Sequence, residues 1–215
     1  MLLLAERQQP RSALARPIDL HRHTHRYMMR KPDPDRLAAQ CGRSKLVSPG
    51  GHWNPPLSGD MDLRITRDGT WHHEGRPILR ESLVRLFSTI LRRDEDGHYY
   101  LLTPAEKWRI QVDDVPFLAI FLESEGKGET QTLRFTTNLG DRVEAGPEHP
   151  IQVKYTVPDS EPAPYVHVRQ RLWARISRSV FLELAQLGSE RESDNKKILG
   201  VWSQREFFSL GSLEE

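Results

Sequence analysis

The chain has 215 residues, 28% of them charged, and its mean hydropathy of -0.63 is that of a water-soluble globular protein. This length can bury a core in one domain or two small ones, and no apolar run approaches the roughly 20 residues of a membrane-spanning helix. The single cysteine excludes an internal disulfide framework and favours a reducing cytoplasm. Because Glu6 and Arg7 interrupt the apolar start, we expect no secretory signal, no membrane contact and a cytoplasmic location.

The first 31 residues carry most of the positive charge. They hold seven basic and two acidic side chains, a balance of +5, so residues 32–215 carry −4 of the overall +1. An acidic body is a poor candidate for gripping long duplex nucleic acid, although the basic segment can contact polyanions weakly. Since the segment lacks helical or strand periodicity, we predict a disordered basic extension over residues 1–31.

Residues 32–52 are predicted to form a short helix and a linker. Asp33 is a suitable N-cap, Pro34 suits the first helical position, and Gly42 stands just past the predicted end. The remainder is rich in serine, proline and glycine, which is typical of a linker.

Residues 53–138 are predicted to be an N-terminal α+β module. Apolar and polar residues alternate from Met61 to Ile65, which indicates a strand, and Asp68-Gly69 is a strong hairpin signal. A helix is expected from Arg80 to Arg92 because apolar residues recur there at three- and four-residue spacing. Further strands are predicted over residues 70–73, 99–102, 107–112, 117–122 and 130–137.

Residues 139–215 are predicted to be a C-terminal α+β module. Strands are expected over 151–155 and 165–168, then a long helix from Arg169 to Leu187, a polar loop, and two final strands over 198–202 and 207–210. A constant offset of 89 residues places the first predicted helix on the second, with Arg80 on Arg169. We therefore predict an internal duplication, and an α+β fold in which each antiparallel sheet is backed by a helix.

Polar side chains on two predicted strands are candidates for a site. Asp60, Asp62 and Arg64 share one face of the first strand, and Lys107 and Arg109 share the outer face of a later one. The two carboxylates can hold a divalent cation, or they can form charge pairs with the basic residues. No glycine-rich phosphate loop, Ser-His-Asp order or zinc-type spacing is present, so we predict no cofactor and no catalytic residue.

The rigid Trp53-Asn54-Pro55-Pro56 segment either lines a groove as a stacking surface or staples the N-terminal helix to the sheet. Because ligand pockets favour domain interfaces, we predict a ligand-binding site where the two halves meet. Its predicted residues are Trp53, Asn54, Asp60, Asp62, Arg64, Lys107, Arg109, Asn138 and Arg169.

The string W-N-P-P-L-S-G-D-M-D-L-R-I-T-R-D-G-T-W at 53–71 resembles the signature of domain-of-unknown-function family 1285, found in bacterial proteins. The resemblance continues through T-P-A-E-K-W-R-I at 103–110, D-D-V-P-F at 113–117 and P-Y-V-H-V-R at 164–169. It implies a duplicated two-domain architecture whose C-terminal half is similar to a pleckstrin-homology unit. It also implies a nucleotide-like or nucleic-acid-like ligand at the domain interface, a part in signalling, and no established enzymatic activity.

Three functions remain open from the sequence. The first is a non-catalytic module that holds a nucleotide-like anionic ligand between its halves. The second is a metal-dependent phosphoester hydrolase built on Asp60 and Asp62, which a third nearby carboxylate would favour. The third is a structural protein that binds a partner chain and no small ligand. The sequence does not indicate an oligomeric state.

Overall fold

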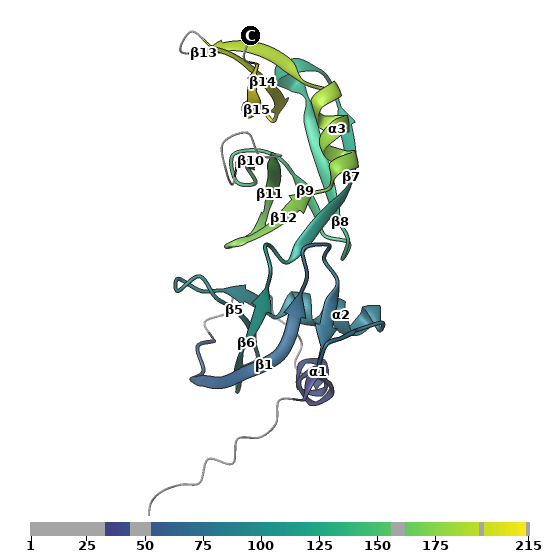
Figure 1. Ribbon diagram of the computed structural model, residues 1–215, viewed down its shortest axis with the longest axis vertical. Coiled ribbons are helices and arrows are strands. Elements are labelled where there is room, and N and C mark those ends of the chain that lie inside the picture. Colours follow the sequence, from purple (N-terminus) through teal and green to yellow (C-terminus); the bar gives the residue numbers. More distant parts are fainter. Residues whose placement is uncertain (1–32, 44–52, 156–161, 194–195, 214–215) are drawn as a thin grey trace, which may run out of the picture. The chain divides into compact units, whose positions relative to one another are not determined.

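The computed structural model describes residues 33–43, 53–155, 162–193 and 196–213, and every structural statement below refers to these ranges. The predicted basic extension at 1–31 and most of the predicted linker lie outside them. The described part of the chain is mostly β, with two six-stranded sheets, a three-stranded sheet and few helices (Figure 1). In this part, no helix combines the length and the apolar character needed to cross a membrane.

The first sheet has the strand order β3-β2-β1-β6-β5-β4, in which the central pair β1 and β6 is parallel and the other pairs are antiparallel. Two helices accompany it, α1 (Pro34–Arg43) and α2 (Glu81–Thr89). Its strands are β1 (Leu57–Ile65), β2 (Trp71–His73), β3 (Arg76–Pro77), β4 (Leu91–Arg93), β5 (Tyr99–Leu102) and β6 (Lys107–Val112).

Local sequence signals explain most of this first half. In β1, Met61, Leu63 and Ile65 are buried while the residues between them are exposed, as their alternation predicts. The Asp33 carboxylate caps α1 by accepting from the backbone N–H of Asp35 at 3.0 Å. The capping, the strand alternation and the turn at residues 68–69 are all confirmed.

The second sheet has the strand order β10-β11-β12-β7-β8-β9, again with a parallel central pair, β12 and β7. A helix α3 (Arg178–Gln186) and the separate sheet β13-β14-β15 complete the second half. The strands of the second sheet are β7 (Phe117–Glu125), β8 (Thr132–Thr137), β9 (Arg142–Glu144), β10 (Ile151–Lys154), β11 (Ala163–Arg169) and β12 (Leu172–Ile176). A 3-10 turn η1 (Gly128–Thr130) joins β7 to β8, and the last three strands are β13 (Ser189–Ser193), β14 (Lys196–Ser203) and β15 (Glu206–Leu213).

Two predicted helices are too long. The helix expected from Arg80 to Arg92 ends at Thr89, and β4 follows because the buried Leu91 pairs with Leu101 across an antiparallel ladder. The helix expected from Arg169 to Leu187 is wrong in its first half. There the chain turns at Gln170, whose φ of 50° is left-handed, and continues as strand β12.

The predicted 89-residue offset is also wrong. Arg80 immediately precedes helix α2, whereas Arg169 is the last residue of strand β11, so the two arginines do not begin equivalent helices. The two sheets nevertheless share one strand order. The second sheet, written in reverse as β9-β8-β7-β12-β11-β10, matches the first sheet when β1 to β6 correspond to β7 to β12. The helix lies between the third and fourth strands in the first half and after the sixth strand in the second.

The structure groups β7 and β8 with the second sheet, although the sequence placed them in the N-terminal module. The grouping follows from the pairing of β7 with β12, which joins residues 117–119 to 174–176. Strand β7 is central in its sheet, but its second half is not buried on both faces. A register shift between Ala119 and Phe121 leaves Ile120 and Phe121 about half exposed, at 49% and 54%.

Candidate functional site

A row of polar side chains crosses the outer face of the first sheet. Strand pairing aligns Asp60 of β1 with Arg109 of β6, Arg109 with Tyr100 of β5, and Tyr100 with Arg92 of β4. Because side chains alternate along each strand, these four point to one face while their neighbours fill the core. The Arg109 guanidinium donates to both carboxylate oxygens of Asp60, with an Nη2–Oδ2 distance of 2.9 Å.

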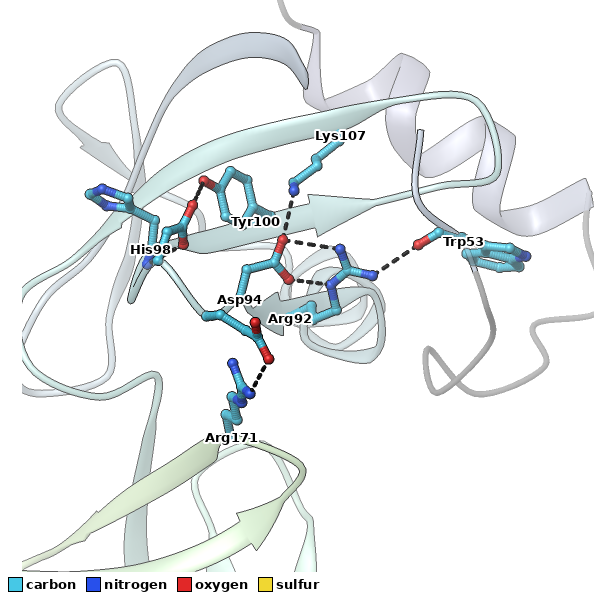
Figure 2. A network of polar contacts seen from close by, with 9 residues as sticks. Trp53, Arg92, Asp94, His98, Tyr100, Lys107 and Arg171 are labelled. Carbon is cyan, nitrogen blue, oxygen red and sulfur yellow. Dashed lines mark hydrogen bonds and ion pairs between the residues drawn. The ribbon is translucent and has the colours of Figure 1, made fainter. Parts of the chain in front are cut away.

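The acidic turn between β4 and β5, which contains Asp94 and Asp96, contacts this row. The Asp94 carboxylate accepts from Lys107 Nζ at 2.6 Å and from two nitrogens of Arg92, as Figure 2 shows. The same Arg92 guanidinium donates to the backbone carbonyl of Trp53 at 2.8 Å. One carboxylate therefore fixes two cations and, through Arg92, the segment that enters β1.

Two pKa values in this network depart from their ordinary values. Burial raises the pKa of Asp94, but the hydrogen bonds from Arg92 and Lys107 outweigh burial, and the pKa lies below its ordinary value. The Tyr100 hydroxyl donates to Asp96 at 2.6 Å, and this bond together with burial raises the pKa of Tyr100 to about 12. Tyr100 is therefore a hydrogen-bond donor at neutral pH and not a base.

Beside the acidic turn lies a cavity of about 620 Å³, which we call the β4–β5 groove. Both halves of the chain contribute to it, because Gln170 and Arg171 come from the turn between β11 and β12. Arg171 Nη2 donates to Glu95 Oε1 at 2.8 Å across the groove (Figure 2). The groove is lined by Asn54, Arg92, Arg93, Asp94, Glu95, Asp96, Lys107, Gln170 and Arg171.

Two of the nine residues predicted from the sequence, Asn54 and Lys107, line this groove. Trp53 adjoins it through its carbonyl bond to Arg92. Asp60 and Arg109 line a different cavity of about 560 Å³ on the same sheet. The structure therefore brings a part of the predicted set together at the groove.

The other predicted residues have separate contacts. Arg64 is paired in bidentate fashion with Asp113, at 2.7 and 3.0 Å, and Asp62 is exposed beside it on β1. Asn138 accepts from the backbone N–H of Leu118 at 3.1 Å. These contacts are structural, and the single nine-residue cluster expected at the interface does not form.

Arg169, the last of the predicted residues, joins the two halves of the chain. Its Nη1 donates to Asp141 at 2.7 Å, its Nη2 donates to the Ser88 carbonyl at 2.8 Å, and its guanidinium lies over the Phe117 ring at 4.9 Å. Through these three contacts, Arg169 holds α2 against the second sheet.

The described residues contain no group of three or more His, Cys, Asp or Glu side chains that could hold a metal ion. Asp60 is instead engaged by Arg109, whose hydrogen bond lowers the pKa of the Asp60 carboxyl. The third carboxylate that would favour a hydrolase is thus not found near Asp60 and Asp62 in the described ranges.

Sequence reasoning missed the groove residues supplied by turns. The turn at 94–97 carries three carboxylates with different partners: Asp94 accepts from Arg92 and Lys107, Glu95 from Arg171, and Asp96 from Tyr100. Alternation along β5 and β6 was the available signal, because it places Tyr100, Lys107 and Arg109 on one face. No comparable signal marked Arg171, which fell within a helix that does not form.

The fold and the groove define a two-domain protein, each domain built on a six-stranded sheet with a parallel central pair. Residues 48–115 match the family model "Domain of unknown function (DUF1285), N-terminal domain", and residues 116–210 match "Protein of unknown function (DUF1285), C-terminal domain". The chain belongs to the DUF1285 family. The two models meet at residues 115 and 116, in the connection between β6 and β7.

Solved structures of the same family are similar to this chain. A crystal structure of a DUF1285 family protein from Silicibacter pomeroyi DSS-3 is 46% identical, with a TM-score of 0.72, and the match covers 82% of this chain and 95% of that chain. Another, from Shewanella baltica OS155, is 26% identical with a TM-score of 0.46 and covers 59% of this chain and 91% of that chain. No curated protein matches the chain.

Proposed function

We propose that the protein is a non-catalytic binding module that holds a nucleotide-like anionic ligand in the β4–β5 groove. The observation that supports this proposal is that polar residues from both halves converge on one cavity of about 620 Å³. Four basic side chains and three carboxylates line it, so the lining carries a net charge of +1. A ligand bound in this groove would contact both domains at once.

The groove contains one ion pair that an anionic ligand can replace. Arg171 and Glu95 have side chains that are 51% and 88% exposed, and exposed pairs contribute little to stability. A phosphate can take the place of Glu95 on the Arg171 guanidinium, where bidentate geometry suits it. The amides of Asn54 and Gln170 then supply donors and acceptors for the edge of a base.

The test is calorimetric titration of the full-length protein with ATP, ADP and AMP, with adenosine as the uncharged comparison. We expect saturable binding of the nucleotides that weakens as salt is raised, and weaker binding of adenosine. Arg171→Ala should lower nucleotide affinity about tenfold, since a charge-assisted hydrogen bond is lost. Arg142→Ala is the matched control, because Arg142 is an exposed arginine on β9 that does not line the groove.

Two results would reject the proposal. One is the absence of saturable binding by any of the three nucleotides. The other is binding that Arg171→Ala and Arg142→Ala affect equally, because the groove would then have no part in it.

Three broader proposals accompany this function. We propose that the C-terminal half is pleckstrin-homology-like, supported by a six-stranded sheet that is followed by the helix α3. We propose that the halves arose by duplication, supported by their shared strand order, and that the module serves signalling in the cytoplasm. The basic extension at 1–31 would add weak contact with polyanions, because its charge is +5.

A further inference from the structure

A second cavity, of about 480 Å³, shares no lining residue with the β4–β5 groove. It lies where the first turns of α3 meet the end of β12, the start of β11 and the turn between β1 and β2. Its volume falls within the range of about 300–1,000 Å³ that is typical of small-molecule sites. We call it the α3 pocket.

Three arginines and no carboxylate line the α3 pocket: Arg67, Arg175 and Arg178. Arg175 is held from behind by Asp114, with an Nη1–Oδ2 distance of 3.0 Å, and the Tyr165 hydroxyl donates to the same carboxylate. Asp114 offsets the charge of Arg175, and the charge of Arg67 remains as an excess of positive charge at the pocket. Such a site favours an anion, and guanidinium groups suit carboxylates and phosphates through their fork geometry.

Arg67 is placed at the pocket by a hydrogen-bonded turn. Thr66 and Thr70 pair through the backbone, and the Asn138 side-chain amide donates to the Gly69 carbonyl at 3.4 Å, which ties the turn to the second sheet. Among the ion pairs of the described residues, none includes Arg67, and its side chain is exposed. An arginine held in position beside a cavity, with no carboxylate on it in the described ranges, is free to take a ligand anion.

The rest of the wall is apolar. Ile176 is buried, Phe181 is half-buried and Leu182 is 57% exposed on α3, although the sheet core is complete without Leu182. An apolar group that covered this leucine would be stabilised there, because burial removes apolar surface from water. The lining thus combines a cationic side and an apolar side within one pocket.

We propose that the α3 pocket binds a small amphiphilic anion. Its carboxylate or phosphate head would contact Arg67 and Arg175, and its apolar body would cover Phe181 and Leu182. This pocket is independent of the β4–β5 groove, so the protein would carry two ligand sites of different chemistry, one polar and one amphiphilic.

The test is calorimetric titration of the full-length protein with octanoate and octyl phosphate, below the concentrations at which they form micelles. Octanol supplies the body alone, and acetate and inorganic phosphate supply the heads alone. We expect at least one amphiphile to bind at least about tenfold more tightly than octanol and than its own head group. The ratio between octanoate and octyl phosphate then identifies the preferred head.

Two variants locate the binding. Arg67→Ala removes an exposed guanidinium and Leu182→Gln replaces an exposed leucine, so neither should disturb the fold, and each should weaken the amphiphile about tenfold. Arg142→Ala, which removes the same charge from the edge strand β9, should leave the affinity unchanged. The proposal is overturned if neither amphiphile binds, if octanol binds as tightly as octanoate, or if Arg67→Ala and Leu182→Gln both leave the affinity unchanged.

Discussion

The two halves of the chain build the same six-stranded sheet with different accessories. Each sheet pairs its first strand with its sixth in parallel, and flanks this pair with two antiparallel meanders. The first half inserts α2 between the meanders, whereas the second half joins them directly and places α3 after the sixth strand. The same strand order therefore forms whether the helix follows the third strand, as α2 does, or the sixth strand, as α3 does.

The halves also differ in how their outer charges are arranged. On the first sheet, Asp94 binds both Arg92 and Lys107, and Asp60 binds Arg109, so each of these three cations is paired within the fold. At the α3 pocket, Asp114 pairs with Arg175, while Arg67 takes part in none of the ion pairs of the described residues. The same strand order thus carries an ion-paired polar surface in the first half and a cationic pocket in the second half.

The largest expected effect tests whether the two sheets are equally important to stability. Phe87 on α2 and Phe135 on β8 are both fully buried, each at 0% exposure. Phe87→Ala and Phe135→Ala should each lower the free energy of unfolding by about 3–5 kcal/mol, from lost burial and from the cavity left behind. Urea denaturation followed by tryptophan fluorescence measures both; two separate transitions would show that the halves unfold independently.

Next in size is the contact that joins the halves. Arg169→Ala removes hydrogen bonds to Asp141 and to the Ser88 carbonyl and should cost about 2–3 kcal/mol. Arg169→Lys keeps the charge but not the fork and should recover only a part of the loss. A thermal melt that is unchanged for Arg169→Ala would mean that the halves are held together elsewhere.

A turn glycine sharpens the comparison on a smaller scale. Gly69 has a φ of +81°, and a Cβ there would lie 2.6 Å from the Asn138 amide of the other half, whereas Gly75 has a φ of +73° and open space around it. Gly75→Ala should cost about 1 kcal/mol from backbone strain alone, and Gly69→Ala about 2 kcal/mol because it also displaces Asn138. Equal costs in chemical denaturation would show that the turn does not press on the second half.

The smallest expected effect is the loss of stability in acid at the ion-paired surface of the first sheet. The pKa of Asp94 is lowered in the folded state, so its stabilisation is present above the ordinary carboxyl value of about 3.9 and is lost as pH falls through the lower folded value. Denaturation midpoints at pH 7, 4 and 3 should fall more steeply below pH 4 for the native protein than for Asp94→Asn. Asp62→Asn, an exposed carboxylate on β1, is the control and should leave the slope as it is.

Much of the fold could be predicted because strand alternation is a local property. The pattern at Met61, Leu63 and Ile65 decided β1, and the Asp68-Gly69 turn decided its hairpin. The stretch from Leu172 to Ile176 was misjudged because its apolar residues also suit a helix that runs on to Leu187. The strand is favoured by the pairing of β12 with β11 and with β7, and β7 is more than fifty residues away in sequence.

The candidate site was predictable to a smaller extent for the same reason. Lys107 was found because alternation along one strand identifies outward residues without knowledge of the fold. Its partner Asp94 and the opposing Arg171 lie on turns, and the place of a turn in space depends on the pairing of whole sheets. Local patterns therefore identify which side chains face outward, while the identity of their partners is a property of the tertiary structure.

The parallel central pairs have a consequence for how the chain reaches its native state. Leu57 pairs with Lys107, and Phe117 with Ala174, so each sheet closes only between its first strand and its last. In non-local pairing of this kind, the chain loses loop-closure entropy before the new contacts stabilise it. Folding is therefore slow compared with that of helical proteins. During synthesis the first sheet is complete once β6 has emerged, before any strand of the second sheet is needed. The first half can therefore fold first, and the second half can then fold against its surface.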